Sequence, residues 1–385
     1  APPFVVYLPV VARNYTPSAT TEAIIEPGIG GEIGSPDGKV RIVFGPEAVT
    51  ETVVVQYTPI DPPALPPGNL GVGGPAFDIS AQTLDGAPVR EFAPLVSIVP
   101  GPPDVTIVTP TVKVYVNYTP EDTWGLDLRE FFLYTRDGLG EEWERVPSAV
   151  YQGQQQLVAE VSHLSQFVPM APLSASFTVL DVASNKRLAL DPDDDVGHAY
   201  WPDVGEVRET PMAFHLAQET RQRFEADDCQ IDILVTRNSD SERFVSRELR
   251  AESARNFNAE MFATLTFDAL IGSPWGWEGD GGLHAWARDG NANDAALVDQ
   301  FFARIDEYTH RPYDWGGPHD FLPYSEFNDV APHYAHIEML YLDHNSDWPW
   351  IHDNFSAVAD ASYAALRTRL EAEGLVCGND PNNPP

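Results

Sequence analysis

Three consecutive aspartates, a histidine and a glutamate follow one another between Leu188 and Glu209, in the stretch LALDPDDDVGHAYWPDVGEVRE. Carboxylate oxygens and imidazole nitrogens are ligands that zinc takes in proteins. The stretch begins like a buried β-strand, so these side chains would gather where that strand ends. The residues alone fit three interpretations: an acidic surface loop, a metal site lengthened by an insertion, or a metal site that has decayed.

Glu338 is the second candidate for chemistry, because it lies in the otherwise apolar run IEMLYL. A carboxylate inside an apolar strand is costly unless it has a partner, so we predict a functional role for Glu338. A buried salt bridge is the alternative. His336 stands two residues before Glu338 and therefore points to the same side of that strand.

Alternating strands and helices must position these residues. From residue 173 on, helical patterns alternate with runs typical of strands, namely RLALD, IDILVTR, MFATLTF, GGLHAWAR and YAHIEMLYL. A last helix is expected from about 354 to 373, ending before Gly374. This order predicts an α/β domain over residues 173–385 with a mostly parallel sheet, whose sites lie beyond the carboxyl ends of the strands.

The order of these elements resembles the zinc-dependent N-acetylmuramoyl-L-alanine amidases, which cut the peptide stem from peptidoglycan. The resemblance is carried by VTRNSDSERFVSRELRAESARNFNAEMFATLTFDAL and HIEMLYLDHNSDWPWIHDNFSAVADASYAAL. It implies that Glu338 polarises a zinc-bound water and that Glu209, at a helix start, is a metal ligand. Without a metal, Glu209 would simply complement the helix dipole. His198 is a further ligand if residues 193–196 are an insertion, and Asp194 takes that place if they are not.

The third ligand is where this chain departs from the family. Thr266 stands at the position of a histidine, and a threonine hydroxyl is a poor zinc ligand. Asp268 is the favoured substitute, because it lies two residues on and shares the strand face. His336 and His284 are the other candidates. A set of three carboxylates would suit a harder metal than zinc.

Residues 22–172 have the pattern of an all-β sandwich, in which runs such as KVRIVF, TVVVQY, VKVYVNY and REFFLYTR are separated by Pro, Gly and Asp turns. GGEIGSPDGKVRIVFGPEAV, FFLYTRDGLGEEWERVPSAV and VAEVSHLSQFVPM resemble the β-sandwich domain of ankyrins, netrin receptors and many secreted bacterial proteins. Some members of that family cleave themselves at His-Phe-Ser, and His163-Leu164-Ser165 stands at the matching place. Either the Ser165 hydroxyl attacks the preceding carbonyl, or these residues close the last strand.

Residues 1–21 hold an apolar run over residues 4–12, followed by a Thr/Ser/Pro spacer. The run is either a tether or a free strand that completes a sheet in another subunit. Because no methionine precedes it, Ala1 looks like the end left after removal of a signal peptide. Cys229 and Cys377 lack metal spacing, so they form either a disulfide, as suits an exported protein, or two free thiols.

Composition limits the partners. The 385 residues carry a formal net charge of −35, which disfavours binding to nucleic acid and to anionic membranes. No apolar run approaches the length of a transmembrane segment.

The first functional hypothesis is a secreted, metal-dependent amide hydrolase acting on peptidoglycan stem peptides. The second is a catalytically inactive structural or binding protein that assembles through residues 4–12 into a surface filament.

Overall fold

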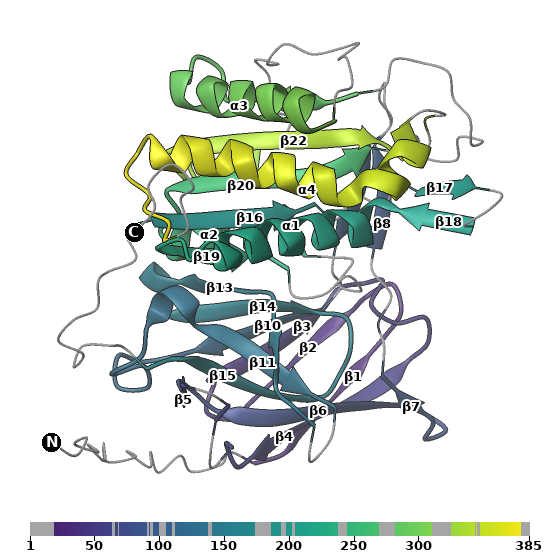
Figure 1. The fold of residues 1–385 in the computed structure, drawn as a ribbon. Coiled ribbons are helices and arrows are strands. Elements are labelled where there is room, and N and C mark those ends of the chain that lie inside the picture. The colour runs from purple at the N-terminus through teal and green to yellow at the C-terminus, as the bar shows by residue number, and fades with distance from the viewer. Residues whose placement is uncertain are drawn as a thin grey trace, which may run out of the picture.

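A computed structural model gives the fold of the chain. It describes residues 19–63, 66–67, 69–90, 92, 95–99, 105–109, 112–137, 141–173, 186–193, 198–201, 205–237, 245–268, 282–309, 325–342, 344 and 347–378. Strands β1 to β15 build an N-terminal domain, and the elements from β16 to α4 build a C-terminal one (Figure 1). None of the described helices is long and apolar enough to cross a membrane.

Two antiparallel sheets make up most of the N-terminal domain. The first runs in the order β1 (Thr21–Ile25), β4 (Val53–Ile60), β6 (Ala76–Thr83), β15 (Gln166–Pro172), β11 (Phe132–Arg136) and β12 (Glu144–Val146), with β5 (Leu70–Val72) on β15 and β7 (Pro88–Val89) on β6. The second runs β13 (Ser148–Tyr151), β14 (Gln156–Val161), β10 (Val112–Asn117), β3 (Val40–Phe44) and β2 (Gly31–Gly34). Two short 3-10 helices, η1 (Leu128–Glu130) and η2 (Gln152–Gln154), connect strands. A separate ribbon consists of β8 (Leu95–Val99) and β9 (Val105–Thr109) alone.

Alternating burial along the strands explains why these two sheets close on each other. In β10, Val112, Val114 and Val116 are buried while the residues between them reach the surface. Residues from both sheets form one apolar cluster, in which the rings of Phe77 and Phe167 lie 5.6 Å apart. The period of two in the sequence therefore gives each sheet one apolar face, and the two faces share a core.

The C-terminal domain contains a five-stranded sheet. Its strand order is β19 (Ile231–Val235), β16 (Lys186–Pro192), β20 (Met261–Asp268), β22 (His333–Tyr341) and β21 (His284–Trp286). All neighbours are parallel except β21, which runs antiparallel to β22. Four strands therefore end at the same edge of the sheet, as the alternation of strands and helices in the sequence predicts.

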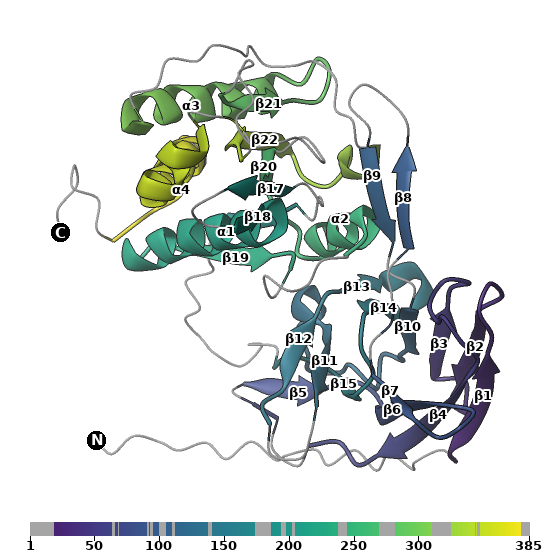
Figure 2. The ribbon, with the colours of Figure 1, turned by 90° about the vertical axis from the view of Figure 1, so that its right-hand side faces the viewer.

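Helices cover both faces of this sheet (Figure 2). On one face, α1 (Glu209–Ala226), α3 (Ala292–Thr309) and α4 (Asp347–Glu371) share an apolar core with residues of β16, β20 and β22. On the other face, α2 (Arg247–Asn256) packs against Ala189, Phe262 and Tyr334. That second cluster also contains Phe132 of β11, so α2 lies between the sheet and the N-terminal domain.

Hydrogen bonds join the two domains along α2 and β19. The Ser253 hydroxyl donates to the Ser148 carbonyl at 2.7 Å, and the Arg145 guanidinium donates to the Val235 carbonyl at 2.6 Å. The Glu160 carboxylate accepts from the Ser246 amide at 2.6 Å, just before α2 begins. The side of the sheet that carries α2 is therefore held against the N-terminal domain.

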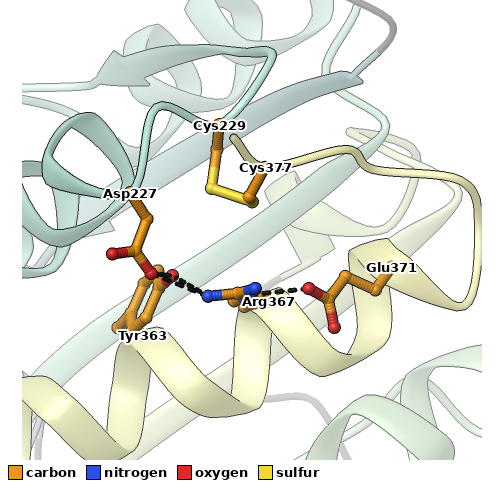
Figure 3. The surroundings of a disulfide bond; sticks show 6 residues. All are labelled: Asp227, Cys229, Tyr363, Arg367, Glu371 and Cys377. Atoms are coloured by element: carbon orange, nitrogen blue, oxygen red, sulfur yellow. Dashed lines mark hydrogen bonds and ion pairs between the residues drawn. A yellow bond between two sulfur atoms is a disulfide. The ribbon is translucent and has the colours of Figure 1, made fainter. Parts of the chain in front are cut away.

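A disulfide joins Cys229, before β19, to Cys377, after α4 (Figure 3). Beside it, the Arg367 guanidinium of α4 donates to the Asp227 carboxylate at 2.7 Å and to the Glu371 carboxylate at 2.6 Å. These contacts tie the end of the last helix to the segment that follows α1.

Three local features differ from the sequence expectations. The last helix begins at Asp347 rather than near 354, and non-helical backbone at Asn354 divides it, so the predicted helix is its second part. The segment between β16 and α1 contains an unpredicted hairpin, β17 (His198–Trp201) and β18 (Gly205–Arg208). A short 3-10 helix, η3 (Ser325–Phe327), precedes β22.

Candidate functional site

Polar residues form two rows across the carboxyl end of the sheet. In the outer row, Glu338 of β22 is paired in register with Thr266 of β20 on one side and with His284 of β21 on the other. In the next row inward, His336 is paired with Thr264 and with Trp286. Residues two apart on a strand share a face, so both rows lie on the α2 side of the sheet.

The environment of Glu338 disfavours its charged form. Its side chain is 21% exposed, and one carboxylate oxygen lies 3.5 Å from Nε2 of His336, which is 1% exposed. Burial raises the pKa of Glu338 to about 8, and repulsion from the Asp193 carboxylate adds to the effect. A carboxyl with that pKa exchanges its proton near neutral pH, which is what general acid–base catalysis requires.

A register shift between β20 and β22 follows Glu338. Thr266 pairs with Glu338, but Asp268, two residues further along β20, pairs with Tyr341, three residues further along β22. Such bulges re-aim side chains and occur often beside active sites. Here the shift follows Glu338 directly, at the point where β22 ends.

A buried arginine holds the end of β16. The Arg250 guanidinium of α2 donates to Asp191 at 2.8 Å and to Asp193 at 2.9 Å, and all three side chains are fully buried. Asp191 also accepts from the hydroxyls of Thr236 at 2.6 Å and Thr264 at 3.1 Å. Two buried carboxylates therefore share one guanidinium, and this network connects β16, β19, β20 and α2.

Aromatic rings flank the two rows. The Trp286 ring lies edge-on to His336 with centroids 5.2 Å apart, and the Tyr341 ring lies edge-on to His284 at 5.4 Å. Rings beside polar groups offer apolar surface to the flat face of a sugar or to a peptide. Below them, the Asp347 carboxylate accepts from the Tyr341 amide at 3.2 Å and so fixes the end of β22.

Glu209 is the first residue of α1, as the resemblance implies, and its side chain is buried. Arg237, fully buried, donates to the carbonyl of the neighbouring Thr210 at 2.7 Å and lies over the Phe214 ring. The start of α1 is thereby attached to the end of β19.

The predicted metal ligands are only partly open to a fit test. His198 lies on β17 and Asp268 at the end of β20, but their side chains, and all of Asp194, lie outside the described residues. Among the residues described here, no three His, Cys, Asp or Glu side chains converge on a common point for a metal. Asp193, in the segment considered as an insertion, is bound to Arg250. Zinc binding therefore stays a prediction.

The two residues of the self-cleavage hypothesis have separate partners. The ring of His163, on the surface, faces Asp137 at 3.8 Å. The Ser165 hydroxyl is buried and hydrogen-bonded to the Thr135 hydroxyl. Self-cleavage thus stays a prediction, and so does a donor strand over residues 4–12, which lie outside the described part of the chain.

Sequence reasoning missed Arg250, Asp191 and Asp347. The signal for Arg250 was present, because it occupies the apolar face of the α2 pattern beside Leu249 and Ala254. A charged residue on such a face needs a buried partner of opposite sign, and the aspartates after the β16 run were the available ones.

No family model matches the chain, and no curated protein matches it either. Solved structures whose backbone fold is similar to part of this chain include N-acetylmuramoyl-L-alanine amidases. The enzyme from Clostridium difficile 630 is 17% identical with a TM-score of 0.41 and covers 49% of this chain and 98% of its own. The catalytic domain of CwlV from Bacillus (Paenibacillus) polymyxa is 15% identical with a TM-score of 0.39, covering 48% and 98%. AmiC2 of Nostoc punctiforme is 19% identical with a TM-score of 0.36, covering 48% and 97%. Because these TM-scores are low, the likeness carries no conclusion about activity.

Proposed function

We propose that the C-terminal domain is an amide hydrolase acting on the stem peptides of peptidoglycan, with Glu338 as the group that moves the proton. The observation that supports this most is the environment of Glu338. It combines a pKa of about 8 with a position three residues before the end of β22, and His336 lies 3.5 Å away. A carboxyl buried without function would more simply be replaced by an apolar residue.

In the proposed reaction, ionised Glu338 removes a proton from a water molecule as that water attacks the amide carbon. The same carboxyl then delivers the proton to the departing nitrogen. Arg250 keeps Asp191 and Asp193 in place, so the strand ends around Glu338 are rigid. Trp286, which is half-buried, supplies apolar surface on which the substrate rests.

Zinc binding at this site is a further proposal, and it depends on side chains that lie outside the described residues. His198 and Asp268 would join Glu209, and Asp194, His336 and His284 are the alternatives. A bound zinc would activate the attacking water and polarise the amide. We also propose that the protein acts outside the cell. The Cys229–Cys377 disulfide supports this, because disulfides persist in oxidising compartments.

Purified protein incubated with muropeptides tests the proposal, with zinc content measured on the same sample. Mass spectrometry should find free stem peptides with the wild-type protein and none with Glu338→Gln. Thr266→His should raise both zinc content and rate, because it adds a histidine next to Glu338. Absence of cleavage in the wild-type protein, with and without added zinc, would exclude the hydrolase.

A second candidate is a binding or structural protein without chemistry. The observation that favours it is Thr266, which stands in register with Glu338 and offers only a hydroxyl. Sedimentation with insoluble peptidoglycan separates the two candidates. Retention of the wild-type protein without release of stem peptides would support the second.

A further inference from the structure

The open strand edges of this molecule differ in how well they are protected. An exposed edge pairs with other chains unless it carries charge, is very short or is covered. Charged residues lie in the edge strands β1, β2, β12 and β19 and in the β17–β18 hairpin: Glu22, Glu32, Glu144, Asp232 and Glu206. Strands β5, β7 and β21 have three residues or fewer, and α2 packs against β13.

The β8–β9 ribbon lacks two of these protections, because its strands carry no charge and each has five residues. Its sequences are LVSIV and VTIVT, in which eight of the ten residues are β-branched and none is charged. In the part of the chain that the structure describes, β8 and β9 pair only with each other, and Figure 2 shows the ribbon apart from both sheets of the N-terminal domain. A two-stranded ribbon is marginally stable alone, and a third strand would complete it.

The chain contains one other segment of matching character. Residues 4–11, FVVYLPVV, are apolar, β-prone and uncharged in a protein with a formal net charge of −35. Two copies of so acidic a chain repel each other, and contact between uncharged segments adds nothing to that repulsion. Pro9 has no N–H, so a strand containing it pairs on one side and ends a sheet.

The spacer permits contact between two copies. Residues 12–20, rich in Thr, Ser and Pro, precede β1, which begins at Thr21. An extended spacer of this length spans roughly 30 Å, enough to reach beyond the domain to a neighbour. We propose that residues 4–11 of one copy add as a third strand to the β8–β9 ribbon of a second copy, giving a head-to-tail assembly. This inference is independent of hydrolysis at Glu338.

Light scattering after size-exclusion chromatography tests the assembly at tens of micromolar protein. The full chain should form dimers or longer species, and the chain lacking residues 1–12 should be monomeric. Val108→Lys, which places a charge in β9, should weaken association at least about tenfold. Ile24→Lys, on the 62% exposed Ile24 of β1, is the matched control and should change nothing. Circular dichroism shows whether each variant is folded.

Crosslinking identifies the contact itself. Both native cysteines form the disulfide, so introduced cysteines are the free thiols. A mixture of Tyr7→Cys chains and Ser97→Cys chains should give a crosslinked heterodimer on mild oxidation, whereas Tyr7→Cys mixed with Ile24→Cys should not. Three results would overturn the proposal: assembly that survives the deletion, a monomer at every concentration, or a crosslink between positions 7 and 97 that forms only within one doubly substituted chain.

Discussion

Replacing Glu338 by glutamine should stabilise the C-terminal domain, and the gain should grow with pH. Burial, with a contribution from Asp193, raises the pKa of Glu338 from the ordinary value of 4.5 to about 8. Below pH 4.5 the carboxyl is protonated in both the folded and the unfolded chain. Between pH 4.5 and about 8 only the unfolded chain is ionised, so unfolding releases a proton and the free energy of unfolding falls as the pH rises.

The size of the effect follows from the shift. One pKa unit corresponds to about 1.4 kcal/mol, so the loss in the wild-type protein reaches roughly 2 kcal/mol at pH 6 and roughly 5 kcal/mol above pH 8. Glutamine keeps the shape of the side chain and has no charge to bury. The difference between the two proteins should therefore be near zero at pH 4.5 and close to these values at higher pH.

Urea unfolding followed by circular dichroism at pH 4.5, 6 and 8 measures this difference. Glu121→Gln, at an exposed carboxyl, is the control and should leave the free energy of unfolding unchanged within about 0.5 kcal/mol at each pH. If Glu338→Gln gave no stability gain at pH 8, or the same gain at every pH, the argument for a buried, protonated Glu338 would be refuted.

Arg250→Met should lower the free energy of unfolding by about 3–5 kcal/mol, because it removes the guanidinium that two buried carboxylates share. Arg221→Met removes one partner of an exposed ion pair and should lower the free energy of unfolding by less than about 1 kcal/mol. Equal losses for the two variants in urea unfolding would contradict this prediction. Cys377→Ser should lower the free energy of unfolding by about 2–5 kcal/mol, because the disulfide joins cysteines 148 residues apart in the sequence. An unchanged melting temperature would argue against this prediction. Mass spectrometry tests self-cleavage: fragments that disappear in Ser165→Ala would establish it, whereas a single 42.4 kDa chain would exclude it.

The sequence predicted the elements of the C-terminal domain because each carries its own period. The apolar runs became β16, β19, β20 and β22, and Glu209 opens α1 as expected. His336 and Glu338 share a face because they are two residues apart, which is a local property of a strand.

The long-range features could not be predicted in the same way. The bonds from Arg250 to Asp191 and Asp193 join residues more than fifty positions apart, and only the packing of α2 brings them together. The register shift after Thr266 depends on how β20 and β22 pair, which neither strand shows alone. The separate β8–β9 ribbon could not be predicted either, because its apolar sequences resemble those of core strands.

The pH dependence of amide cleavage tests most directly the claim that Glu338 moves the proton. Stem peptides released from muropeptides are measured between pH 5 and pH 10, with and without added zinc. The rate should rise with pH and level off above about 8, where Glu338 becomes ionised. Glu338→Gln should lower the rate at least about a hundredfold. No release at any pH, or the same profile in Glu338→Gln, would contradict the account.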